Sequence, residues 1–238
     1  ALLREGRDVL YLGFSSGLSG TYQAIELLLT ELAGLYPDRT VASVDTLAAS
    51  LGEGLLVYYA AKMREEGASI EKVRDWVEEH KLHLAHWFTV DDLMFLFRGG
   101  RVSRTSAWAG TLLNIKPVMH VDDEGHLIPL EKVRGRKKSL KALVDHMEQT
   151  ADAPVADQTV FITHGDCRED AEFVAEEVRE AAEAGKGVKV LRPGGRVKAL
   201  AGFLAFFLGM TLFLSALGAL GNRIAWERDP SPRWEWDW

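Results

Sequence analysis

Apolar residues follow two patterns along the first eighty residues: short continuous runs, and positions spaced three and four apart. Residues 8–14 (DVLYLGF) form an apolar run too short for a helix, which predicts a buried strand. From Thr21 onward, apolar residues recur at spacings of three and four, which predicts a helix to about Tyr36, where Pro37 ends it. A second strand is predicted at 40–45 and a second helix at 47–63, and Ser69 is a predicted cap for a third helix. This strand–helix order predicts a parallel α/β layer.

The second half has a different pattern. Residues 111–133 read as two extended runs around the turn at 122–125, which predicts a hairpin with a glycine in its turn. A helix follows, and then a strand at 159–164, a helix ending near Gly185 and a strand starting at Val188. We therefore expect an α/β protein of two domains: an α/β domain at 1–85 and an α+β domain at 86–238.

Residues 199–221 carry no charge, and the run is long enough to span a membrane. Four glycines interrupt it, so a buried core helix is the simpler interpretation and no stable membrane insertion is expected. We expect no regular element in the tryptophan-rich tail that follows, RIAWERDPSPRWEWDW.

The charge distribution adds a candidate docking face. The chain of 238 residues has a formal charge of −7, which gives no general reason to expect nucleic acid. Residues 98–141 hold ten Lys/Arg and four Asp/Glu, so this segment is +6 and the remainder −13. A single cysteine, Cys167, fits a reducing, cytoplasmic location. No signal segment precedes the first predicted strand, and we expect that the N-terminal part of a longer protein is missing.

The loop after the first strand, FSSGLSGTYQAI at 14–25, offers two kinds of chemistry. GFSSG matches a G-x-S-x-G nucleophile elbow, in which Ser15 would attack and Asp45 with His120 or His164 would complete a triad. Alternatively, hydroxyls and backbone N–H groups at a helix start would hold a carboxylate or phosphate. That anion site would use Ser15, Ser16, Gly17, Ser19, Gly20 and Thr21. A plain capped turn is the third interpretation.

Other motifs are weaker. Arg101, in RGGRVSRT, could complete an anion site or face a partner. KVRGRKK at 132–138 favours a protein-docking patch or a solvated helix start, because it lacks the aromatics of a nucleic-acid site. His80, His83 and His86 cannot all share a helix face, so we expect surface histidines and no metal site. THGDC at 163–167 allows a Cys–His pair, although a turn is favoured.

Several longer blocks, in order, resemble the DegV family of bacterial fatty-acid-binding proteins, the carrier subunits of fatty acid kinases. They are SSGLSGTYQ, VDTLAASLGEGLL, FTVDDLMFLFRGGRVS, GTLLNIKPVMHVDDEGHLIPLEKVRGRKK and HGD. The resemblance runs from residue 1 to about 190. It implies a two-domain fold that encloses one long-chain fatty acid in an apolar tunnel.

The resemblance also implies roles for particular residues. The carboxylate would lie at the SSGLSGT loop, with Ser15 and Ser16 in contact and Arg101 in the surrounding network. A partner kinase catalytic subunit would dock near Arg134, Arg136 and Lys137 and phosphorylate the carboxylate. The chain would then be a carrier with no catalytic residue, no metal and no cofactor. The family's TSQPS-like loop and HTGPG-like motif, which supply further contacts, have no counterpart in this sequence.

Overall fold

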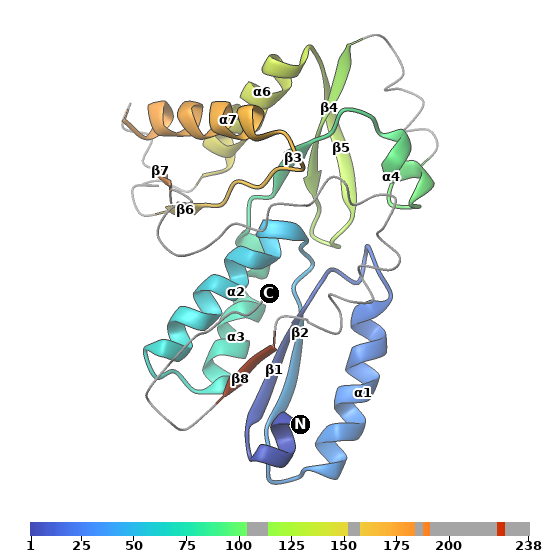
Figure 1. Ribbon diagram of the computed structural model, residues 1–238, viewed down its shortest axis with the longest axis vertical. Coiled ribbons are helices and arrows are strands. Elements are labelled where there is room, and N and C mark those ends of the chain that lie inside the picture. The colour runs from blue at the N-terminus through green and yellow to red at the C-terminus, as the bar shows by residue number, and fades with distance from the viewer. Residues whose placement is uncertain (104–113, 152–157, 184–187, 191–222, 227–238) are drawn as a thin grey trace.

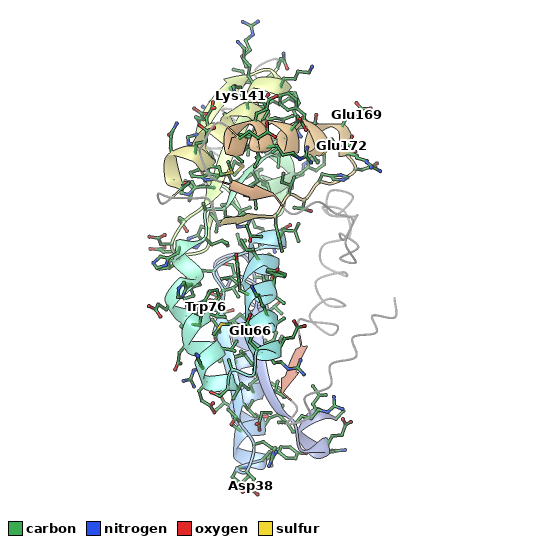
Figure 2. The ribbon with its side chains drawn as sticks, turned by 90° about the vertical axis from the view of Figure 1, so that its left-hand side faces the viewer. Asp38, Glu66, Trp76, Lys141, Glu169 and Glu172 are labelled. Carbon is green, nitrogen blue, oxygen red and sulfur yellow. The ribbon has the colours of Figure 1, made fainter. Side chains whose placement is uncertain are left out.

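The computed structural model describes residues 1–103, 114–151, 158–183, 188–190 and 223–226. In chain order its elements are η1 (Leu2–Glu5), β1 (Asp8–Gly13), α1 (Thr21–Leu35), β2 (Val41–Asp45), α2 (Ser50–Glu65), α3 (Ile70–His80), η2 (Lys81–His83), β3 (Trp87–Thr89), α4 (Met94–Arg98), β4 (Ile115–Val121), β5 (Leu127–Arg134), α6 (Arg136–Thr150), β6 (Gln158–Val160), α7 (Arg168–Ala181), β7 (Val188–Val190) and β8 (Arg223–Trp226). The described elements are divided between two halves stacked along the long axis, with Asp38 near one end and Lys141 near the other (Figures 1 and 2).

The first half is built on a sheet with strand order β2-β1-β8. Strands β1 and β2 are parallel, as the sequence predicts, and Leu12 pairs with Val44 in their register. Helix α1 lies on one side of this sheet, and α2 and α3 lie on the other (Figure 1). Leu10, Val44, Val73 and Val77 are fully buried in the core between the sheet and these two helices.

Two predictions for the first half are wrong in detail. The second helix begins at Ser50 rather than at residue 47, because the backbone before it is not helical: Leu47 has a positive φ of 51° and Ala49 is extended. The tail does contain a regular element, since β8 pairs antiparallel with β1. Its alternating apolar positions are too few to predict a strand, and only the free edge of β1 creates the pairing.

The second half is built around the antiparallel sheet β3-β4-β5. The predicted hairpin is present as β4 and β5, and its turn, Asp122–Gly125, is closed by the Gly125 N–H donating to Asp122 O at 2.9 Å. Two predicted elements are shorter than expected: the strand at 159–164 ends at Val160, and the helix ends at Ala181. The predicted domain boundary near residue 85 falls between η2 and β3 and stays a prediction. Strand β8, although it is C-terminal to the second half, belongs to the sheet of the first half.

Candidate functional site

The loops that follow β1 and β2 lie together, because the carboxyl ends of parallel strands share one sheet edge. Thr46 is fully buried, and both its backbone N–H and its Oγ1 donate to Gly13 O, at 3.1 and 2.7 Å. The Ser15 N–H donates to Ala48 O at 2.9 Å. Asp45 Oδ1 accepts the N–H of Ser16 at 3.2 Å and of Leu47 at 3.1 Å. These bonds fix the first loop onto the second.

Ser15 joins this loop pair to the hairpin of the other half. Its side chain is fully buried, and its Oγ donates to Gly125 O at 2.8 Å while accepting the Gly17 N–H at 3.2 Å. Gly125 has a φ of +77°, and a Cβ there would lie 2.0 Å from Ser15 Oγ. A Cβ on Gly17 would lie 2.6 Å from Glu124 O. The hairpin turn therefore sits directly on the SSG segment, and two glycines permit the approach.

The rest of the predicted loop site is organised around the start of α1. Ser19 and Thr21 share a hydrogen bond between their hydroxyls at 2.8 Å, and Ser19 Oγ also accepts the Thr21 N–H at 3.2 Å. Gly20 is the N-cap residue and is exposed. Ser16 is partly exposed, and its hydroxyl has no hydrogen-bond partner among the described residues. It is thus a hydroxyl that a ligand could engage.

Arg101 lies against the same loop, as the sequence allowed. Its Nε donates to Leu18 O at 3.1 Å, and its guanidinium also donates to Gly99 O. It follows α4, whose Phe97 and Leu96 carbonyls accept the N–H groups of Gly100 and Arg101. Gly100 at φ +77° makes this tight reversal possible. This turn therefore positions the positively charged Arg101 side chain in contact with the SSGLSGT loop.

A partly open cavity of about 720 Å³ lies between the two halves. Its wall combines Phe14 and Leu18 of the loop, the first turns of α2, the end of α3, strand β3 and the facing sides of α6 and α7. Most of this wall is apolar, and Arg101 is one of its charged members. Such a volume is within the range of about 300–1,000 Å³ that is usual for small-molecule sites.

The predicted ligand residues divide around this cavity. Arg101 lines it directly, as do Leu18 of the SSGLSGT loop and Phe14, which precedes that loop. Ser15, Ser16, Gly17, Ser19, Gly20 and Thr21 are not part of the wall. The Ser15 hydroxyl hydrogen-bonds to Gly125 O and so holds the hairpin turn against the loop, while its contact with a ligand stays a prediction.

The nucleophile-elbow interpretation finds no support in this geometry. All seven histidines lie in the described part of the chain, and none of them hydrogen-bonds to Ser15. His164 Nδ1 accepts the Cys167 N–H at 3.2 Å, and His120 packs against Trp87 with ring centroids 5.4 Å apart. Asp45 is occupied by two backbone N–H groups. A serine without a base, and fully buried, has no route to activation.

The three clustered histidines differ from one another: His80 and His86 are partly buried and line the cavity, so the expectation of surface histidines is wrong for these two. His83 is exposed, as expected. His80 stacks on Trp76 at 4.4 Å, and its Nδ1 bonds to Trp76 O at 2.8 Å. His86 is packed inward, and a Cβ on Gly52 would lie 2.6 Å from its Nδ1. Burial lowers the pKa of His86 from 6.5 to about 4, so its imidazole is neutral at neutral pH.

THGDC is a turn that leads into α7, in line with the favoured interpretation. Asp166 has a positive φ of 57°, and His164 accepts a backbone N–H rather than contacting the Cys167 thiol. Within the described ranges, no group of three or more His, Cys, Asp and Glu side chains could hold a metal ion.

The three predicted docking residues are not equivalent. Arg134 and Lys137 are exposed at the end of β5 and the start of α6. Arg136 lines the cavity instead, with its Nε 2.8 Å from Asp170 Oδ2 and its NH1 3.9 Å from Asp91 Oδ1. We therefore assign the accessible positive charge to Arg134 and Lys137.

Among the described helices, none is both long and apolar enough to cross a bilayer. The apolar run 199–221 lies outside the described residues.

Sequence reasoning missed two features of this region. The seat of the hairpin on Ser15 joins residues 110 positions apart, and only the DDEG turn signal pointed to Gly125. The contact between His86 and Gly52 has no sequence signal, because a glycine in a predicted helix indicates locally only a low helix propensity.

Comparisons with known proteins all point to one family. The model of a family described as "Uncharacterised protein, DegV family" matches residues 1–190. A DegV domain-containing protein of Clostridium perfringens is 52% identical over 178 residues, covering 75% of this chain and 61% of that protein. One from Streptococcus pyogenes is 42% identical, covering 74% and 60%. The chain thus spans about three fifths of the length of these relatives.

Solved structures give the same result. A DegV lipid-binding protein of Thermotoga maritima matches with a TM-score of 0.62 at 34% identity, covering 72% of this chain and 57% of that one. A fatty-acid-binding DegV family protein of Streptococcus agalactiae matches with a TM-score of 0.65 at 31% identity, covering 80% and 65%. The resemblance seen in the sequence is confirmed, and this chain belongs to the DegV family.

Proposed function

We propose that this protein binds a long-chain fatty acid in the cavity between its halves and presents the carboxyl group to a partner kinase for acyl phosphate formation. The cavity of about 720 Å³, largely apolar and bordered by Arg101 and the SSGLSGT loop, is the observation that carries the proposal. Relatives that are 34% identical, from Thermotoga maritima and Thermus thermophilus, are named for lipid or fatty acid binding.

Burial of the acyl chain supplies the affinity. At about 0.8 kcal/mol per methylene, a sixteen-carbon tail gains roughly 12 kcal/mol when it leaves water. Ordering the chain and fixing the ligand in place offset part of this gain, and a retained ligand is still expected.

The carboxylate requires donors, since a buried charge without them is costly. We infer that it lies beside Arg101, which lines the cavity and donates through its Nε to Leu18 O of the loop. A guanidinium can donate two parallel hydrogen bonds to a carboxylate. Ser15 would act indirectly, by holding the hairpin against this loop.

Lipid extraction tests the binding step. The purified protein, extracted into organic solvent and analysed by mass spectrometry, is expected to carry about one fatty acid per chain. Arg101→Ala is expected to lower this occupancy, whereas Arg74→Ala, on the exposed Arg74–Asp75 pair of α3, is expected to leave it unchanged. An empty wild-type protein that also fails to take up added palmitic acid would overturn the proposal.

The kinase step rests on a more distant likeness. A Streptococcus pneumoniae protein named as a fatty acid kinase B3 protein, loaded with linoleic acid, has a TM-score of 0.70 at 22% identity, which establishes a shared fold only. The further support is the exposed positive pair Arg134 and Lys137 beside the cavity-lining Arg136. Such charges mainly steer association and fix orientation.

A charge-reversal experiment tests this surface. Arg134→Glu with Lys137→Glu is expected to weaken binding to a purified fatty acid kinase catalytic subunit at least tenfold, without changing lipid content. Lys72→Glu, an exposed reversal on α3, is the matched control. Arg136 is left intact, because its substitution would also break the pair with Asp170. Equal kinase affinity in the double variant and the control would refute the docking assignment.

A further inference from the structure

One polar side chain of the cavity wall has no role in the proposed grip on the carboxylate. His86 lies between η2 and β3, and its backbone is held by the Val121 N–H donating to its carbonyl at 3.3 Å. Its ring lies against Gly52 in the first turn of α2 and 6.3 Å from the ring of Phe88. It is thus fixed by two elements and still borders the cavity.

The Nδ1 atom of His86 is buried and has no hydrogen-bond partner among the described residues. Gly52 explains this position, since any larger residue would put a Cβ 2.6 Å from Nδ1 and Cε1. An unsatisfied buried polar group usually costs about 1–3 kcal/mol. Nδ1 lies against Gly52 at the start of α2, and Nε2 makes no hydrogen bond to a described residue, so Nε2 is the ring nitrogen left for a ligand in the cavity.

Several other polar groups of the wall are already paired. Thr89 donates to Pro117 O, and the Tyr59 hydroxyl donates to Thr159. Arg136 also has a buried, unbonded NH1, but its charge is compensated by Asp170. His86 differs from these groups, because its Nδ1 has no hydrogen-bond partner and its ring pairs with no carboxylate among the described residues.

The charge state of His86 indicates the kind of group it would recognise. In these surroundings the imidazole is uncharged at neutral pH, so it has one N–H and one lone pair to offer and no positive charge. Arg101 is the wall residue suited to an anion. A neutral ring in an apolar wall is suited to a neutral oxygen, which can donate to it or accept from it.

We propose that His86 is a specificity-determining residue that selects fatty acids carrying a hydroxyl group along the acyl chain, through a hydrogen bond at its Nε2. The inference rests on the proposed fatty acid binding and adds a substrate class to it. A plain hydrocarbon chain would leave Nε2 without a partner, whereas a hydroxyl at matching depth would satisfy it.

Displacement assays on delipidated protein test this selection. The probes are stearic acid and a series of stearic acids hydroxylated at successive carbons, including 12-hydroxystearic acid. The measured quantity is the affinity for the best hydroxylated isomer divided by the affinity for stearic acid. This ratio is expected to be roughly tenfold higher in the wild type than in His86→Phe, which corresponds to one net hydrogen bond. His146→Phe, outside the cavity wall and stacked on Trp87, is expected to keep the wild-type ratio.

The outcomes separate the two proposals. Equal ratios in the wild type and His86→Phe across the whole series, with stearic acid bound by both, would overturn the role of His86 and leave fatty acid binding intact. Failure of the wild type to bind any of these acids would overturn fatty acid binding itself.

A measurement on the wild type avoids reliance on the folding of a variant. In protein labelled with nitrogen-15 histidine, 12-hydroxystearic acid or a better isomer should shift the His86 Nε2 resonance, whereas stearic acid should not. Identical spectra with both ligands would also overturn the inference.

Discussion

Replacing Gly125 by alanine should separate the two halves of the protein at the point where they are joined. Gly125 has a φ of +77°, which costs a residue with a Cβ about 1–2 kcal/mol. The new Cβ would lie 2.0 Å from Ser15 Oγ and 3.2 Å from Leu47 Cα. The turn must therefore move away, with overpacking of about 1–3 kcal/mol. The bond from Ser15 Oγ to Gly125 O, worth about 1 kcal/mol, would be lost as well.

We therefore expect Gly125→Ala to lower the free energy of unfolding by about 3–6 kcal/mol. Gly67→Ala is the matched control, because Gly67 has a φ of +87° and no atom lies within 4 Å of the place that a methyl group would take there. It should cost only the backbone term of about 1–2 kcal/mol. Urea unfolding of delipidated protein, followed by the fluorescence of the seven tryptophans, measures both values.

A double-mutant cycle isolates the Ser15 contact. Ser15→Ala removes the closest atom, so the double variant Ser15→Ala/Gly125→Ala should be more stable than the sum of the single losses predicts, by about 1 kcal/mol or more. If Gly125→Ala costs no more than Gly67→Ala, the hairpin does not depend on this seat.

Three further predictions concern the same region. His86→Phe should flatten the pH dependence of stability. The pKa of His86 is about 4 in the folded protein and the ordinary value is 6.5, so between these values the unfolded chain binds the extra proton and the wild-type free energy of unfolding falls as the pH is lowered from about 6.5 to 4, then levels off. Urea titrations of the variant that match the wild type across this range would contradict the prediction. Asp45→Ala should lower the free energy of unfolding by about 1–3 kcal/mol, because two backbone N–H groups lose their acceptor, and an unchanged urea midpoint would exclude that role. A fluorophosphonate probe should not label native protein, because Ser15 is buried and has no base; stoichiometric labelling lost in Ser15→Ala would restore the hydrolase hypothesis.

Local sequence patterns correctly predict the elements whose periodicity is unbroken. The parallel pair β1 and β2, helix α1 up to Pro37, the Ser69 cap and the β4–β5 hairpin all follow from local spacing and turn chemistry. The motif blocks were sufficient to identify the family, since they are long and occur in order. Local spacing wrongly predicts a helical conformation at Leu47, which has a positive φ. The Leu47 N–H donates to Asp45 Oδ1, and the neighbouring Ala48 O accepts the Ser15 N–H. These two hydrogen bonds stabilise the left-handed conformation of Leu47.

Which residues line the candidate site depends on packing between distant segments of the chain. The sequence predicts Ser15 as a ligand residue but does not predict that its hydroxyl donates to Gly125 O, or that Arg101 lines the cavity together with Phe14 and Leu18. Packing likewise assigned Arg136 to the cavity and left Arg134 exposed, although the two are separated by one residue. It also brought His86 against Gly52. The physical reason is that burial and charge pairing depend on surfaces from distant parts of the chain, which spacing along the sequence does not encode.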